Sequence, residues 1–136
     1  MQDIAVIGAG SYGTCLAMLF GNAGHHVHLW CRSATTAAEI ESSRENQAYL
    51  PGFRLPESVR VTHDIATAVA DKQFVLGVTP SHGIRDVLGA AAPHLHPDAV
   101  VINASKGLED KTLATIDQVY REIFPSRIAA RATYLS

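Results

Sequence analysis

Three glycines close to the N-terminus, Gly8, Gly10 and Gly13, form the pattern G-x-G-x-x-G between a short apolar run and a segment with helical periodicity. The first glycine permits a tight turn, the second lets a ligand approach the backbone, and the third lets the helix pack closely on the strand. Ser11 and Tyr12 would add amide donors at the start of the helix, and Ser11 also a hydroxyl. We therefore predict a pyrophosphate site from Gly8 to Gly13. The alternative, a purely structural turn, is disfavoured by this strand-to-helix context.

The end of the second apolar run indicates which nucleotide would bind. In dinucleotide-binding folds, an acid about twenty residues beyond the glycines binds the ribose 2′-hydroxyl of NAD. Here the run ends in Trp30-Cys31-Arg32-Ser33, without an acid. The planar guanidinium of Arg32 suits a 2′-phosphate, so we expect NADP(H) as cofactor, with use of NAD(H) left open. The alternative is that Arg32 is an ordinary solvated arginine.

Other side chains offer less chemistry. Lys106 follows a later apolar run, where its ammonium could hold a phosphate or hydroxyl oxygen, although an isolated lysine is more often simply solvated. His82 lies near a predicted helix start, and a structural role is the better interpretation. The histidines form no H-x-x-x-H pair, and the two cysteines are not in metal-ligand spacing. We expect no metal site and assign no catalytic acid.

Alternating strands and helices must position these residues. Apolar, β-branched runs predict strands at 3–7, 26–30, 59–62, 74–78, 99–103 and 129–135, and periodic segments predict helices at 11–23, 34–43, 64–70, 81–92 and 112–124. Parallel neighbours require crossover helices, so we predict an α/β fold: a Rossmann-type, doubly wound, mainly parallel sheet of about six strands with helices on both faces. Ligands in such folds bind at the carboxyl ends of the strands.

Three finer expectations follow from the same patterns. We predict that the helix at 11–23 buries Leu16, Leu19, Phe20 and Ala23, and that the helix at 112–124 buries Leu113 with four later apolar residues. Ser81 is expected to cap the helix that follows it. The segment 44–56 contains three turn-forming residues, namely Pro51, Gly52 and Pro56, and is predicted to be a long surface connection.

Composition excludes several other functions. The chain has 136 residues and a formal net charge of −2 with both signs interspersed, so one domain without a nucleic-acid-binding face is expected. No charge occurs from Ile4 to Ala23, but glycines and polar residues interrupt this stretch, and no membrane insertion or signal peptide is predicted. Cys15 and Cys31 lie in apolar segments, as buried free thiols do, which suits a reducing cytoplasm.

Five motifs occur in a familiar order: Ile7-Gly8-Ala9-Gly10-Ser11-Tyr12-Gly13-Thr14 with Leu16-Ala17, Leu29-Trp30, Asn46 with Tyr49-Leu50-Pro51, Pro80-Ser81-His82, and Lys106-Gly107-Leu108-Glu109. In these motifs the whole chain resembles the cofactor-binding domain of bacterial NAD(P)-dependent sn-glycerol-3-phosphate dehydrogenases. That family reduces dihydroxyacetone phosphate to sn-glycerol 3-phosphate, a phospholipid precursor, with NADPH or NADH.

The resemblance implies residue roles and a wider context. Ser11, Tyr12, Arg32 and Lys106 would contact the cofactor, Tyr49 would border its adenosine end, and Lys106 would also touch the substrate. Members of the family commonly pair as dimers, so a homodimer is expected for the full-length protein. Members also continue into a helical domain that supplies the proton-donating lysine, so residues 1–136 would be the cofactor domain alone, with little or no turnover.

Two alternatives stay open at this point. One is a related two-domain dehydrogenase of a 2-hydroxy acid or sugar phosphate, and the other is a non-catalytic, dinucleotide-sensing domain. One departure from the family pattern is Thr79, which stands where members usually have a small aliphatic residue.

Overall fold

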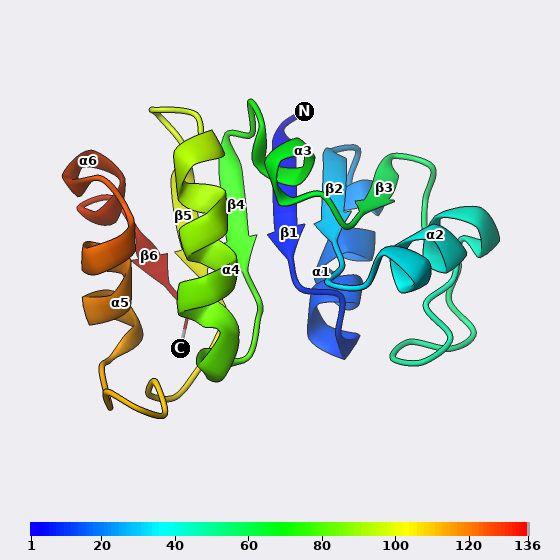
Figure 1. The fold of residues 1–136 in the computed structure, drawn as a ribbon. Coiled ribbons are helices and arrows are strands. Elements are labelled where there is room, and N and C mark those ends of the chain that lie inside the picture. The colour runs from blue at the N-terminus through cyan, green and yellow to red at the C-terminus, as the bar shows by residue number, and fades with distance from the viewer. Residues whose placement is uncertain (136) are drawn as a thin grey trace.

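Six parallel strands form one sheet in the order β3-β2-β1-β4-β5-β6 in the computed structural model, which describes residues 1–135 (Figure 1). The sheet grows from β1 in one direction through β2 and β3, and in the other through β4, β5 and β6. This order is that of doubly wound dinucleotide-binding sheets, so the predicted fold class is confirmed. The strands are β1 (Asp3–Ile7), β2 (His26–Trp30), β3 (Val59–Thr62), β4 (Phe74–Gly77), β5 (Val100–Asn103) and β6 (Thr133–Tyr134).

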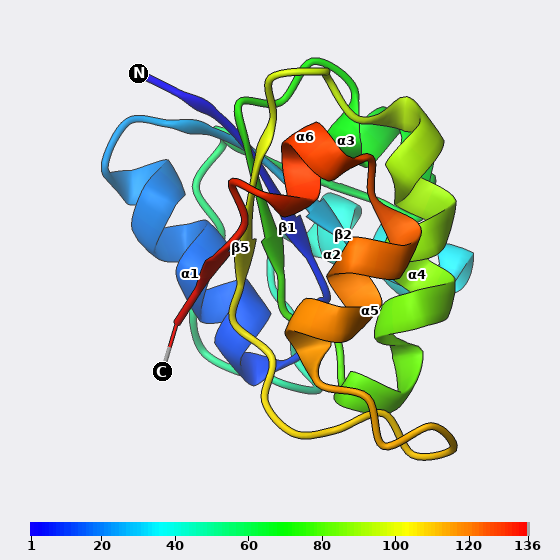
Figure 2. The same cartoon turned by 90° about the vertical axis from the view of Figure 1, so that its left-hand side faces the viewer.

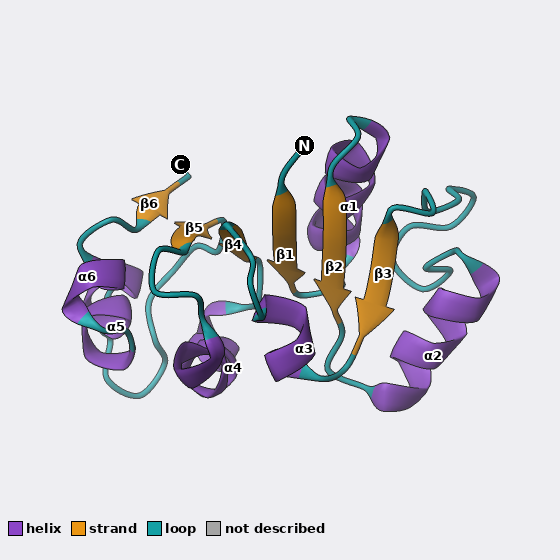
Figure 3. Cartoon of the chain, turned by 90° about the horizontal axis from the view of Figure 1, so that it is seen from above, coloured by secondary structure: helices purple, strands orange, loops and turns teal. Residues whose placement is uncertain are grey.

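Helices cover both faces of the sheet. Helix α1 lies on one face, while α3, α4 and α5 lie on the other, and α2 runs beside the β3 edge (Figures 2 and 3). Right-handed crossovers on either side of β1 produce this division, because the chain winds away from β1 in opposite directions. The helices are α1 (Ser11–Asn22), α2 (Ala34–Ser43), α3 (Ile65–Val69), α4 (Ile84–Ala91), α5 (Ile116–Ile123) and α6 (Ser126–Ala129), with short 3-10 turns η1 (Ser81–Gly83) and η2 (Ala92–His94).

The two faces of the sheet bury separate apolar cores. Along β1, Ala5 and Ile7 pack toward α4 and α5, whereas Ile4 and Val6 pack toward α1. Successive side chains of a strand point to opposite faces, so a strand covered on both sides is apolar at every position. The uninterrupted apolar run after Asp3 is therefore what a central strand requires.

The buried face of α1 differs from the predicted one. The buried residues are small, namely Gly13, Thr14, Ala17 and Gly21, whereas Leu19 is 62% exposed. Of the four residues predicted to be buried, Leu16 and Phe20 are partly buried against the core, whereas Leu19 and Ala23 are exposed. The helix lies so close to the sheet that only small residues fit directly between them. Cys15 is also exposed, contrary to the prediction, while Cys31 is buried as expected.

The C-terminal third departs most from the prediction. The helix expected at 112–124 begins only at Ile116, because Thr115 and Gln118 form a capping box that sets its start. Leu113 lies before that cap, is 67% exposed and has a φ of 58°. The strand expected at 129–135 shrinks to the two residues of β6, because α6 and its C-terminal turn take up the first part of that segment.

The predicted role of Ser81 was also wrong. The chain forms the 3-10 turn η1 there, the hydroxyl of Ser81 makes no capping hydrogen bond, and the α-helix starts at Ile84. Within residues 1–135, no helix is both long and apolar enough to cross a membrane. The same residues contain no group of three or more His, Cys, Asp or Glu side chains that could hold a metal ion.

We predict that replacing a glycine by alanine changes the free energy of unfolding in opposite directions in two helices. A Cβ at Gly21 of α1 would lie 2.7 Å from Val59 Cγ2, so Gly21→Ala should lower the free energy of unfolding by about 1–3 kcal/mol. At Gly89 of α4 the nearest atom is Ile123 Cγ2 at 4.0 Å, so Gly89→Ala should raise it by roughly 0.5–1 kcal/mol through helix propensity. Urea unfolding measures both, and a shift of equal sign would contradict the close packing of α1.

Candidate cofactor-binding site

Two of the three glycines after β1 are required by the fold itself. Gly8 has a φ of 128°, and a Cβ there would lie 2.9 Å from the carbonyl oxygen of Val78. At Gly13 a Cβ would lie only 1.9 Å from the carbonyl oxygen of Gly8. A side chain at either position would collide with backbone atoms and push the two chain segments apart. This is costly because backbone atoms cannot rotate away as a side chain can.

Gly10 is different, because the fold gives no reason for a glycine there. It is the N-cap of α1 with φ −77° and ψ −169°, an extended conformation open to any residue. Among the described residues, no atom lies within 4 Å of the position that a Cβ would occupy. A glycine at this position keeps the surface above the helix start bare, so that a ligand can reach the backbone.

The first turn of α1 offers peptide donors at that bare surface. The first helical hydrogen bond runs from the Thr14 amide to the Gly10 carbonyl at 3.0 Å, so the amides of Ser11, Tyr12 and Gly13 have no acceptor within the helix. No acid occurs in this turn, and the helix dipole adds partial positive charge. The arrangement suits an anion.

The Ser11 hydroxyl, which we expected to face a ligand, instead donates to the carbonyl oxygen of Tyr49 at 2.8 Å. This bond brings the segment 44–56 next to the glycine turn and places Tyr49, which is 57% exposed, beside it. The backbone amide of Ser11 is thus the donor that remains for a bound anion.

Asn46 was named in the sequence only as part of a family motif, and its role as a structural anchor was not predicted. Its side-chain amide donates to the carbonyl oxygen of Ala9 and to Thr14 Oγ1, both at 2.9 Å, and the residue is 2% exposed. Segment 44–56 is thereby anchored to the glycine turn rather than lying freely over the surface. No local pattern signals this role, because the bonded residues lie more than thirty positions away.

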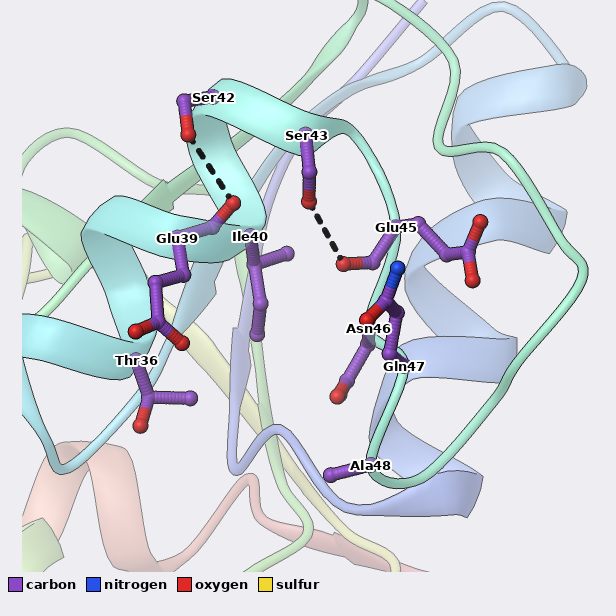
Figure 4. A pocket seen from close by; sticks show the side chains of 9 residues that line it. All are labelled: Thr36, Glu39, Ile40, Ser42, Ser43, Glu45, Asn46, Gln47 and Ala48. Atoms are coloured by element: carbon purple, nitrogen blue, oxygen red, sulfur yellow. Dashed lines mark hydrogen bonds between the residues drawn. The ribbon is translucent and has the colours of Figure 1, made fainter.

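Asn46 and its neighbours in segment 45–48 line, together with α2, a cavity of about 480 Å³. Figure 4 shows the side chains that line it. Ser43 Oγ donates to the carbonyl oxygen of Glu45 at 3.1 Å at the rim of this cavity. Bonds from Arg44 to the carbonyl oxygens of Pro56 and Val59, at 2.6 and 2.5 Å, fix the other end of the segment.

Arg32 follows β2, as expected, and lies at the carboxyl edge of the sheet. It lines a shallow pocket of about 230 Å³ with a mainly apolar floor, together with His63 and Asp86. Its guanidinium lies over η1, since a Cβ on Gly83 would be 3.2 Å from Arg32 Nη2. Within residues 1–135 Arg32 forms no ion pair, so its charge is available to a ligand.

A buried hydrogen-bond network joins the ends of β4 and β5. Asn103 Oδ1 accepts from the Tyr120 hydroxyl and from the Ser105 amide, each at 3.2 Å, and Ser105 Oγ donates to the carbonyl oxygen of Thr79. Burial raises the pKa of Tyr120, which keeps its hydroxyl protonated as a donor. This network fixes the backbone immediately before Lys106, whose own side chain is exposed.

The structure therefore brings the predicted residues to one edge of the sheet. The glycine turn, Arg32 and Lys106 follow β1, β2 and β5, and the carboxyl ends of parallel strands share one edge (Figure 1). His82 is also exposed at this edge, beside a cavity of about 400 Å³ that it lines with Arg85, Glu109 and four neighbours.

The domain is a nucleotide-binding domain of the Rossmann type, as defined by the order of its strands, its crossover connections and its glycine turn. A family model described as NAD-dependent glycerol-3-phosphate dehydrogenase N-terminus matches residues 3–136. The chain therefore belongs to this family of glycerol-3-phosphate dehydrogenase N-terminal domains.

Individual relatives agree with that assignment. The chain is 41% identical to the glycerol-3-phosphate dehydrogenase [NAD(P)+] of Geobacter sulfurreducens and 40% identical to that of Syntrophotalea carbinolica, over 99% of this chain and 40% of each relative. It is also similar to the crystal structure of glycerol-3-phosphate dehydrogenase from Coxiella burnetii, with a TM-score of 0.85 and 27% identity over 90% of this chain and 37% of that one. The chain thus spans about two-fifths of the length of these relatives.

Replacing either of two buried polar side chains near this edge should affect the stability of the protein differently. Asn46→Ala removes both anchors of the glycine turn and should lower the free energy of unfolding by about 1–3 kcal/mol. Thr79 is 4% exposed and its hydroxyl has no partner within the described residues, so Thr79→Val should leave stability unchanged or raise it. Thermal unfolding of the two variants tests this, and a marked loss for Thr79→Val would reveal a bond that the structure does not show.

Proposed function

We propose that this chain binds NADP(H) on the glycine turn, with use of NAD(H) left open, and that it is the cofactor-binding half of a glycerol-3-phosphate dehydrogenase. The observation that carries the proposal is Gly10. It is a glycine that neither backbone conformation nor packing demands, at the start of a helix whose first amides have no helical acceptor. Close approach of a pyrophosphate explains both features.

The remaining residues would orient the dinucleotide along the carboxyl edge. Amides of Ser11 and Tyr12 would donate to pyrophosphate oxygens, and the guanidinium of Arg32 would hold a ribose 2′-phosphate. Tyr49 would border the adenosine end, and the Lys106 ammonium would face the nicotinamide end and the substrate. When bound, a reduced nicotinamide supplies a hydride for a ketone carbonyl. The family and the names of the relatives support NAD(P) as the cofactor.

For the complete protein we propose reduction of dihydroxyacetone phosphate to sn-glycerol 3-phosphate in the cytoplasm, by a homodimer. The proton that the new alkoxide requires would come from a second, helical domain, and no residue of this chain is assigned as the catalytic acid. The relatives named glycerol-3-phosphate dehydrogenase [NAD(P)+] support a longer enzyme, because this chain covers about 40% of their length.

A titration of this chain tests the binding proposal. NADPH should quench the fluorescence of Trp30 and raise the melting temperature, because a ligand that binds the native state stabilises it. Gly10→Ala should weaken NADPH binding at least tenfold, since its methyl group occupies the approach path, yet cost at most about 1 kcal/mol of stability as a poorer N-cap. Gly89→Ala is the matched control, far from the turn. If neither NADPH nor NADH changed either signal at millimolar concentration, the proposal would fail.

Arg32 should determine which nucleotide is preferred. Arg32→Glu should weaken NADPH binding by about tenfold or more and leave NADH binding nearly unchanged, because a hydrogen bond to a charged group is replaced by like-charge repulsion. Arg127→Glu on α6 is a control with the same charge change, at an exposed ion pair with Asp98. Equal losses for both nucleotides would indicate that Arg32 does not contact the 2′ position.

A further inference from the structure

Lys106 lies on a short exposed span between two fixed points. Ser105 before it and Glu109 after it are anchored, while Lys106, Gly107 and Leu108 between them are all exposed. The four Cα–Cα steps from Ser105 to Glu109 reach at most about 14 Å when fully extended. The position of the Lys106 backbone therefore depends on both anchors.

The anchor before Lys106 belongs to the buried network at the strand ends. The Ala104 amide donates to the carbonyl oxygen of Gly77 at 2.9 Å, and Asn103 Nδ2 donates to that of Ser105 at 2.7 Å. Asn103 and Ser105 are both buried, so this end is held by the sheet itself.

The anchor after Lys106 is ionic. Arg85 of α4 donates two hydrogen bonds to the Glu109 carboxylate, from Nε at 2.8 Å and from Nη2 at 2.9 Å, and Thr112 Oγ1 donates a third at 2.6 Å. The Glu109 side chain is 13% exposed. The Arg85 guanidinium and the Thr112 hydroxyl together lower the pKa of Glu109 to about 2, so the carboxylate stays ionised at any pH near neutrality.

Apolar burial does not hold this segment in place. Leu108 is 48% exposed and Leu113 is 67% exposed, so the large apolar side chains of the loop lie largely in solvent. Arg85 lies just after η1, the turn against which Gly107 packs: a Cβ on Gly107 would be 3.4 Å from Ser81 Oγ. The Arg85–Glu109 pair thus ties the Lys106 loop to the first turn of α4, directly after η1.

We propose that Arg85 and Glu109 are positioning residues, which hold Lys106 where its ammonium meets the bound nucleotide. The inference rests on the proposed function, because it requires that Lys106 contacts the cofactor. Backbone contacts within the loop remain without the pair, namely the Glu109 amide bonded to the Ala114 carbonyl oxygen at 2.9 Å and the bridge between Leu108 and Thr115. These contacts do not tie the loop to α4, so its position over the sheet edge would become variable, and binding would have to order Lys106.

The test is a double-mutant cycle on NADPH affinity. Glu109→Gln and Arg85→Met should each raise the Kd about three- to tenfold, the entropic cost of ordering one long side chain. In a Lys106→Ala background the same changes should have no further effect, since a residue that acts through Lys106 loses its influence when the lysine is gone. A merely structural role would lower affinity in both backgrounds.

A matched control distinguishes the Arg85–Glu109 pair from the second ion pair of Arg85. Arg85 Nη1 also contacts Glu122 of α5 at 2.6 Å, so Glu122→Gln removes the other partner of the same arginine and should leave the Kd unchanged. Melting curves of each variant without nucleotide show whether it is folded.

The outcomes distinguish the two proposals. If Lys106→Ala binds NADPH as the parent chain does, the assigned role of Lys106 fails, and the positioning role fails with it. If Lys106→Ala weakens binding but Glu109→Gln and Arg85→Met do not, or weaken it equally in the Lys106→Ala background, only the positioning role is overturned. The NADPH titrations of the parent chain and of Gly10→Ala test nucleotide binding at the glycine turn independently of Lys106.

Discussion

The close approach of α1 to the end of β1 is the constraint on which the rest of the site depends. A Cβ on Gly13 would stand 1.9 Å from the carbonyl oxygen of Gly8, so the helix meets the strand at backbone distance. This contact brings the start of α1 directly over the carboxyl end of a central strand. The amides of the first turn, which have no acceptor within the helix, then face the edge where two crossovers diverge, which is where ligands bind in such sheets.

The same constraint explains the rest of α1 and the segment that covers it. A helix at this distance fully buries only small residues, so Ala17 and Gly21 face the sheet, while Leu16 and Phe20 are partly buried and Leu19 faces solvent. Asn46 then secures the turn from outside, by bonds to the backbone before the helix and to Thr14 within it. The proposed anion site would thereby be formed before any ligand arrives, which would reduce the cost of ordering it on binding.

Apolar packing and polar anchors have separate tasks in this domain. The two cores on either side of the sheet place the strands and helices, but they do not specify how the loops at the carboxyl edge lie. There, the loops are held by the hydrogen bonds that the buried Asn103 side chain donates to and accepts from Ser105, and by the ion pair between Arg85 and Glu109. Backbone groups would supply affinity for the diphosphate, while exposed side chains such as Arg32 and Lys106 would select the nucleotide and the substrate.

The sequence alone determined the alternation of strands and helices, and from it the parallel doubly wound sheet, because apolar periodicity and glycine positions report local geometry directly. The glycine turn was predictable for the same reason, since strand, turn and helix are contiguous. Only the tertiary structure decided that Leu19 is exposed, that Asn46 anchors the turn and that Arg85 reaches Glu109, 24 positions away. The extended helix at 112–124 was wrong because apolar spacing continued past the cap at Thr115. Local patterns do not record which distant side chains meet, or how closely a helix approaches its sheet.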